Sequence, residues 1–167
     1  QVLAALLVEV DRWVLELGLQ SQGLNTLVAA TSDRLSRLEE YEARTIGLLD
    51  KTDLAVSDDK PVAGLAESQL DLAIELAGYI KSLQRRNQAD PDRDLPPVLS
   101  RLSLAQDALN EAAQSLKDND ADAAIAQQER AADALAEAYA ITVSQNERLS
   151  LLQALLMFQR AVGFANG

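Results

Sequence analysis

Apolar residues recur along the chain at intervals of three and four positions, the spacing that places them on one face of an α-helix. The first such run extends from about residue 2 to about residue 52. Gly18 and Gly23 interrupt it, and each costs a helix about 1 kcal/mol relative to Ala, so this is where a bend would form. We predict one long N-terminal helix whose inward face carries Leu3, Leu6, Val10, Trp13, Leu17, Leu24, Leu27, Leu38, Tyr41 and Leu48.

Two shorter apolar runs follow the first. Pro61 comes after a segment rich in Asp and Ser and fits the first turn of a second helix, over about residues 61–87. Residues 87–94 contain three Asp and a Pro and break the pattern. Pro96 and Pro97 then begin a third helix, over about residues 96–117. The buried positions predicted for these helices are Leu65, Leu72, Leu76, Ile80, Leu83, Val98, Leu102, Ala105, Leu109, Ala112 and Leu116.

A fourth apolar run is again long and extends over about residues 121–164. Asp120 is a suitable N-cap for it, and no Pro or Gly interrupts it before Gly163. Its expected inward residues are Ile125, Ala132, Leu135, Tyr139, Leu149, Leu152 and Leu156.

This order of long, short, short and long helices predicts an all-α fold, an antiparallel four-helix bundle with two long outer helices. Short connections favour antiparallel neighbours, and the long helices then bring both chain ends to one pole. We expect a single domain over residues 1–167. Its distal four-helix part would cover about residues 24–146, and its proximal two-helix part would join about residues 1–20 to 149–164.

The proximal helices carry more apolar residues than one helix–helix contact can bury, so we expect them to form an association surface. The alternative is that the two middle helices lie lower along the long pair and cover these residues. The expected surface consists of Leu3, Leu6, Leu7, Val10, Trp13, Val14, Leu17, Leu152, Leu155, Leu156 and Phe158.

Polar residues occupy inward positions near the middle of both long helices. Gln20, Thr31 and Arg34 lie on the first pattern, and Thr142 and Asn146 lie on the last. Buried polar side chains need partners, so such a layer fixes the register of two helices or lines a small site.

Cations gather around the loop between the two middle helices, and they suggest an anion site together with Gln20 and Asn146. The alternative is local pairing with Asp90, Asp92 and Asp94, because exposed charge clusters are common and weak. The cations that carry this hypothesis are Lys81, Arg85, Arg86 and Arg93, with Arg101 nearby.

Charge and composition narrow the chemistry. A net charge of −11 disfavours nucleic acid and anionic membrane surfaces, which attract basic patches. The absence of Cys and His removes the thiolate and imidazole groups that most nucleophilic, acid–base, haem and transition-metal sites use. We therefore expect no enzyme activity, no cofactor and no resident metal. Because the chain begins at Gln1 rather than Met, we expect it to be part of a longer precursor.

The order of helix lengths, with both termini at one pole, resembles the extracytoplasmic four-helix sensor domains of bacterial chemoreceptors and sensor kinases. The resemblance implies a membrane-proximal, extracytoplasmic module that dimerises along its proximal half and continues into transmembrane helices. It concerns topology, and no ligand-binding signature of that family is carried over to residues here. The sequence itself also leaves a cytoplasmic location open.

Taken together, these patterns favour a non-enzymatic helical interaction or sensory module that associates through its apolar pole, with itself or with a neighbouring domain. The alternatives are a bundle that binds a small anion and a structural subunit of a filament.

Overall fold

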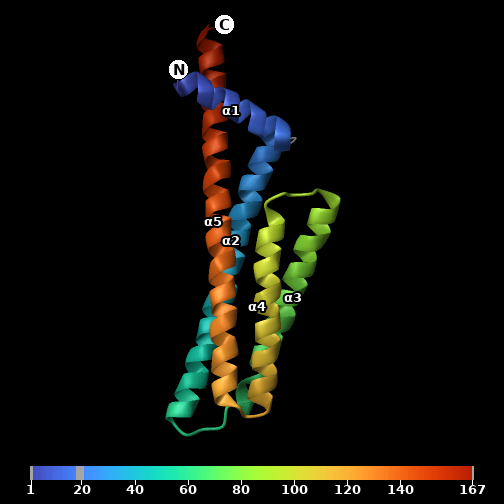
Figure 1. Ribbon diagram of the computed structural model, residues 1–167, viewed down its shortest axis with the longest axis vertical. Helices are drawn as coiled ribbons and strands as arrows, with labels where there is room; N and C mark the ends of the chain where they lie inside the picture. Colours follow the sequence, from blue (N-terminus) through green and yellow to red (C-terminus); the bar gives the residue numbers. More distant parts are fainter. Residues whose placement is uncertain (1, 18–20, 167) are drawn as a thin grey trace. The chain divides into compact units, whose positions relative to one another are not determined.

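The fold is described here from a computed structural model, which places residues 2–17 and 21–166 and all their side chains except those of 10, 11, 13–17, 21, 22 and 164–166. The described residues contain five α-helices and no β-strand, so the chain is all-helical (Figure 1). The helices are α1 (Val2–Leu17), α2 (Ser21–Ser57), α3 (Ala66–Ala89), α4 (Leu95–Lys117) and α5 (Ala121–Asn166), with a 3-10 turn, η1 (Ala63–Leu65), before α3.

One helix was predicted over residues 2–52, and this range includes residues that the structure does not describe. The structure has two helices there, α1 and α2, on either side of residues 18–20, which lie outside the described residues. Helix α2 also continues to Ser57, past the predicted end, and Thr52 is buried within it with its hydroxyl donating a hydrogen bond of 2.8 Å to the Leu48 carbonyl. The α-helical part of the next segment begins later than predicted, at Ala66.

The boundaries after residue 89 are close to those predicted. Asp120 caps α5 as expected, since the Ala123 N–H donates to its carboxylate over 3.2 Å. The preceding turn depends on Asn119, which has a positive φ of 56°. Asn tolerates this left-handed conformation better than most residues. The Asn119 side chain accepts the Val62 N–H over 2.8 Å and so joins this turn to the segment before η1.

The chain divides into two compact units. Residues 36–141 form the central unit, and residues 1–35 together with 142–167 form the terminal unit. The central unit is shorter than the distal part that we expected, because residues 24–35 and 142–146 belong to the terminal unit.

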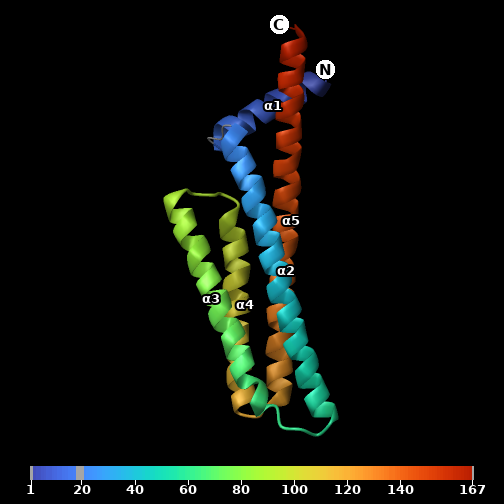
Figure 2. The same cartoon turned by 180° about the vertical axis from the view of Figure 1, so that it is seen from behind.

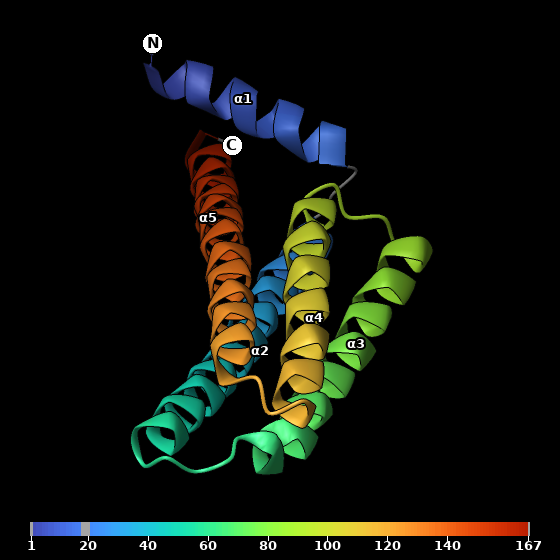
Figure 3. The same cartoon turned by 60° about the horizontal axis from the view of Figure 1, so that its bottom comes forward.

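The central unit has a closed core to which α2, α3, α4 and α5 all contribute. Helices α3 and α4 lie side by side in it (Figures 2 and 3). Every predicted inward position of α4 is buried, but α5 turns a slightly different face to the core than predicted, with Ala131 and Ala134 buried and Ala132 half-buried. The largest core cluster includes Leu38, Tyr41, Leu48, Leu72, Leu76, Ile80, Leu83, Val98, Leu102, Leu109, Leu135 and Ala138.

The terminal unit has a much smaller core. Leu24 of α2 packs with Leu149 and Leu152 of α5, and all three are buried. Four further apolar side chains are only partly buried against them, namely Leu27, Val28, Leu155 and Leu156. Two helices supply this cluster, so each covers only one face of the other.

Candidate functional site

The expected association surface is divided by the structure into buried, half-buried and exposed residues. Leu152 belongs to the core of the terminal unit and is not available to a partner, whereas Leu155 and Leu156 are half-buried. Leu3 and Leu6 of α1 and Phe158 of α5 are exposed, and Leu7 is half-buried. The side chains of Val10, Trp13, Val14 and Leu17 lie outside the described residues.

Helix α5 is apolar on two opposite faces in the terminal unit. One face holds Leu149 and Leu152, which pack on α2. The other face exposes Leu151 by 55%, Phe158 by 46% and, at its margin, Met157 by 67%. Ala154 and Ala161 lie on this second face and are also exposed. Phe158 was predicted as a surface residue from the sequence. The exposed stripe that it forms with Leu151, Ala154 and Ala161 was not predicted.

The polar residues predicted on the inward faces of the long helices are buried or half-buried where the structure describes them. Thr31, Arg34 and Thr142 are buried, and all belong to the terminal unit. The Thr31 hydroxyl and the half-buried Asn146 amide oxygen lie within hydrogen-bond distance, at 2.7 Å. Gln20 lies outside the described residues. This contact connects α2 to α5 at one level and favours a role in helix register.

A second buried polar layer lies in the central unit and was not predicted. Gln128 of α5 donates its amide N–H groups to the Thr52 hydroxyl over 3.0 Å and to the Gln69 amide oxygen over 2.9 Å. All three side chains are fully buried. The Gln69 Nε2 and Gln128 Oε1 atoms have no hydrogen-bond partner among the described residues. The layer therefore links α2, α3 and α5 at the cost of two unsatisfied amide atoms.

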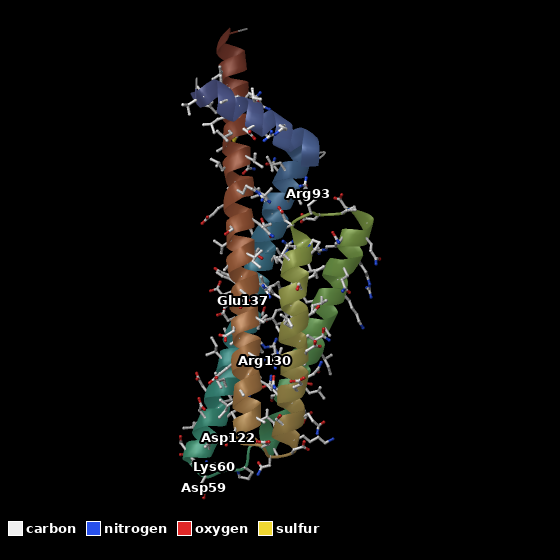
Figure 4. All side chains as sticks on the ribbon, viewed as in Figure 1. Asp59, Lys60, Arg93, Asp122, Arg130 and Glu137 are labelled. Carbon is white, nitrogen blue, oxygen red and sulfur yellow. The ribbon has the colours of Figure 1, made fainter. Side chains whose placement is uncertain are left out.

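The predicted anion-binding cations lie on the surface of the central unit. Lys81, Arg85, Arg86 and Arg93 are exposed, and Arg93 lies on the loop between α3 and α4 (Figure 4). Arg101 instead forms an ion pair with Glu137 of α5, with Nε 3.1 Å from a carboxylate oxygen. The loop is held by side chains that accept backbone N–H groups, Asn87 from Asp92 and Asp92 from Asp94. These observations describe a solvated cationic surface.

A groove between α2 and α3 in the central unit combines aromatic and charged side chains. Its volume is about 340 Å³, and its lining includes the buried Tyr41 and the half-buried Tyr79, whose ring centroids are 5.7 Å apart with planes tilted by 43°. The Arg37 guanidinium lies over the Tyr79 ring, 5.8 Å from its centroid. The residues lining the groove are Arg37, Glu40, Tyr41, Arg44, Glu75, Gly78, Tyr79 and Ser82.

The two arginines that line this groove differ in whether they form ion pairs. Arg44 pairs with Glu75 of α3, and its guanidinium is 3.9 Å from Glu40 on its own helix. Arg37 makes no ion pair within the described residues and retains a guanidinium that can bind an anion. Burial raises the pKa of the Tyr41 phenol above 10.0, and the nearby Arg37 charge opposes this effect. The hydroxyl of Tyr41 is therefore protonated at neutral pH and can donate a hydrogen bond.

Sequence analysis missed this groove because its residues belong to two helices and to both sides of the expected stripe. Tyr41 was predicted only as a core residue. A sequence signal is present in the spacing of Arg37, Tyr41 and Arg44, which lie on neighbouring turns of one helix. The pairing with Tyr79 cannot be read from one sequence, because it depends on how α2 and α3 are aligned.

Within the described residues, no group of three or more His, Cys, Asp or Glu side chains is placed to hold a metal ion. No described helix combines the length and hydropathy needed to cross a membrane. No protein-family model, curated protein or solved structure matches the chain.

Proposed function

We propose that the protein is a non-enzymatic helical module that associates with a second copy of itself through the exposed apolar stripe of α5. The observation that carries the proposal is the second apolar face of this helix. Leu149 and Leu152 already occupy the face turned to α2, so Leu151 and Phe158 do not serve the core of the terminal unit. A contiguous exposed row of this kind is typical of an interaction surface.

The stripe is complementary to itself when two copies run antiparallel. Leu151 and Ala161 lie equally far in sequence from residue 156, and so do Ala154 and Phe158. Antiparallel pairing of two α5 helices about residue 156 therefore sets each large side chain opposite an alanine. Alternation of large and small residues across facing positions lets two helices interdigitate without voids.

A parallel pair is less favourable for the same residues. It would set Leu151 opposite Leu151, Phe158 opposite Phe158, and the small alanines opposite each other. Glu147 lies one turn before Leu151 on the same face and would meet the same carboxylate of the other copy. Like charges placed directly opposite each other are destabilising. These features favour a closed antiparallel dimer with twofold symmetry over open growth into a filament.

The proposal includes the finer architecture of the central unit as an antiparallel four-helix bundle. Its support is the shared core of α2, α3, α4 and α5 and the short segments that connect them. The resemblance to extracytoplasmic sensor domains predicts a parallel dimer with both chain ends on one side. The direction of pairing therefore separates that sensory role from a general association module.

Analytical ultracentrifugation over a range of concentrations tests the association. Leu151→Glu and Phe158→Glu are expected to shift the dimer towards monomer by about tenfold or more in dissociation constant, because each buries a charge in the apolar contact. Ala136→Glu is the matched control, since residue 136 is exposed on the same side of α5 five turns earlier, in the central unit. A wild-type chain that remains monomeric at high concentration would overturn the proposal.

A spin label tests the direction of pairing. The chain has no cysteine, so Ser144→Cys, at an exposed position of α5, carries the only label. Antiparallel pairing about residue 156 separates two such labels by about 36 Å along the helix axes, at ~1.5 Å per residue. Parallel pairing brings them within about 10 Å of each other. The shorter distance would contradict the antiparallel dimer and support the sensor-like arrangement.

A further inference from the structure

A second groove lies between α2 and α5 in the terminal unit and combines apolar side chains with two amides and one charged group. Its volume is about 280 Å³, close to the lower end of the range for small-molecule sites. We propose that this groove binds a short straight-chain carboxylate. The residues that line it are Leu24, Asn25, Gln153, Leu156, Met157 and Arg160, all of the terminal unit.

The apolar side chains of the groove select for an alkyl chain. Leu24 is buried and Leu156 is half-buried, and both belong to the cluster that joins α2 to α5. Met157 also lines the groove and is 67% exposed. The methionine side chain is unbranched and flexible, so it adapts to apolar groups of different shape. The residues that line the groove include no aromatic ring on which a planar ligand could stack.

The charge of the groove selects for an anion. Arg160 is exposed and makes no ion pair within the described residues, and no carboxylate is among the residues that line the groove. The groove between α2 and α3, by contrast, is lined by two carboxylates as well as two guanidinium groups. A guanidinium binds a carboxylate through two parallel hydrogen bonds. Arg160 therefore supplies an uncompensated positive charge beside an apolar wall.

The two amides add hydrogen-bond donors to the same groove. Gln153 Nε2 donates a hydrogen bond to Asn25 Oδ1, and this bond joins α5 to α2. The second N–H of Gln153 Nε2 and both N–H groups of Asn25 Nδ2 have no partner in the described part of the chain. Donors therefore outnumber acceptors among the polar groups of the groove, which favours a carboxylate over an amine.

This inference goes beyond self-association, because the groove and the exposed stripe lie on different sides of α5. Leu156 packs towards α2, whereas Leu151 and Phe158 lie on the opposite face. Met157 lies between the two, at the margin of the stripe. Every residue of the groove comes from one chain, so a monomer contains the complete site.

Butyrate, hexanoate and hexanamide are the probes for the first test, with the side-chain amide signals of Asn25 and Gln153 followed by NMR. A half-open groove with one ion pair is expected to bind hexanoate with a dissociation constant of about a millimolar. Hexanoate should bind about fourfold more tightly than butyrate, because each added methylene is partly removed from water. Hexanamide, which has the same chain without the charge, should bind about fivefold more weakly than hexanoate. Absence of hexanoate binding, or equal binding of the three probes, would overturn the inference.

An arginine variant tests whether the anion lies in this groove. Arg160→Gln is expected to weaken hexanoate binding by about fivefold, the amount that an exposed ion pair contributes. Arg148→Gln is the matched control, since Arg148 is an exposed cation of the same helix and does not line the groove. If Arg148→Gln weakens binding as much as Arg160→Gln does, the anion responds to the general charge of α5, and the inference fails.

Met157→Ala tests the apolar wall. The variant is expected to weaken hexanoate binding by about threefold and butyrate binding by less, because the longer chain covers more of the methionine. Met157 is mostly exposed, so its removal should leave the melting temperature unchanged. Equal weakening of both carboxylates would contradict the assignment of Met157 to the alkyl chain.

Sedimentation of Arg160→Gln separates this site from the α5 dimer. Residue 160 is not part of the exposed stripe, so the variant should dimerise as the wild-type chain does while its affinity for hexanoate falls. A variant that loses hexanoate binding and dimerisation together would overturn the assignment of the site to a single chain.

Discussion

The central and terminal units both contain many leucines and alanines but bury them to different degrees. In the central unit, leucines and alanines from four helices meet in one core. Among the described side chains of the terminal unit, α2 and α5 share a core with three buried leucines, and further apolar side chains remain exposed. The difference shows that the number of helices around a leucine, more than the local density of leucines, decides whether it stabilises the fold or remains available to a partner.

The buried polar residues of the two units also differ in how far they are enclosed. In the central unit, Gln69 and Gln128 are fully enclosed, and two of their amide atoms lack partners among the described residues. In the terminal unit, the half-buried Asn146 amide lies within hydrogen-bond distance of the buried Thr31. The enclosed amides of Gln69 and Gln128 are therefore costly to disturb one at a time.

Removing one leucine from each core gives the largest expected effect. Leu102→Ala should lower the free energy of unfolding by about 4 kcal/mol, whereas Leu152→Ala should lower it by about 2 kcal/mol, because the thinner core can relax around the missing atoms. Both leucines are almost completely buried, so exposure does not explain the difference. Urea denaturation followed by circular dichroism measures both values, and equal losses would mean that the two cores are closed to the same degree.

The buried amides provide the next largest effect. Gln128→Leu should cost about 2 kcal/mol, because it leaves the Gln69 amide without a partner in the core. The double substitution Gln69→Leu with Gln128→Leu should restore stability to the wild-type value or above, since it removes both unsatisfied atoms. Thermal unfolding of the single and double variants tests this. A double variant as unstable as the sum of the two single variants would show that the layer is fully satisfied.

Thr31→Val tests the polar contact of the terminal unit and should cost only about 1 kcal/mol. The substitution removes the hydroxyl that lies near Asn146 but keeps the shape of the side chain. The hydroxyls of Thr31 and Thr45 both lie within bonding distance of carbonyls of their own helix. Within the described residues, however, Thr45 of the central unit makes no hydrogen bond to a second helix and bonds only to the Tyr41 carbonyl, over 2.8 Å, so denaturant unfolding of Thr45→Val is the comparison. We expect Thr31→Val to lower the free energy of unfolding more than Thr45→Val does, and a larger loss from Thr45→Val would contradict this.

The smallest expected effect is a change in folding stability at alkaline pH. Burial raises the pKa of Tyr41, so the folded chain keeps the phenol proton at pH values where the unfolded chain has lost it. Stability from this residue is complete below pH 10.0 and is lost as the pH rises through the folded-state pKa. Tyr41→Phe should therefore reduce the fall in stability above that pH. Tyrosinate absorbance during a pH titration measures which tyrosine ionises last.

Most of the fold could be predicted from the sequence because its signals are local. The Asp-rich breaker and the two prolines in the first turn of α4 indicated its start, and Asp120 indicated that of α5. Gly18 and Gly23 indicated where a bend would form in the first long run, and residues 18–20, which separate α1 from α2, lie outside the described residues. The boundary between the units was missed, since no Pro or Gly marks residues 35 or 141.

The candidate sites were less predictable because they depend on the rotation and alignment of helices. Phe158 was expected on the surface and Leu152 beside it, yet the structure places them on opposite faces of α5. Periodicity alone gives two apolar faces here and does not say which one packs on α2. Tyr41 and Tyr79 come together only through the alignment of α2 with α3, which leaves no trace within either helix.

Helix α4 differs from its neighbours in the central unit in that its buried face consists entirely of leucine, valine and alanine. The polar layer reaches α2, α3 and α5, so α4 meets the core only through the volumes of its side chains, and its ion pair with α5, Arg101 with Glu137, lies at the surface. Volume tolerates rearrangement better than hydrogen bonding does, provided that the total is kept. This makes α4 the segment most open to replacement by a designed helix, and a library that varies only its order of large and small residues would measure how many solutions the core accepts.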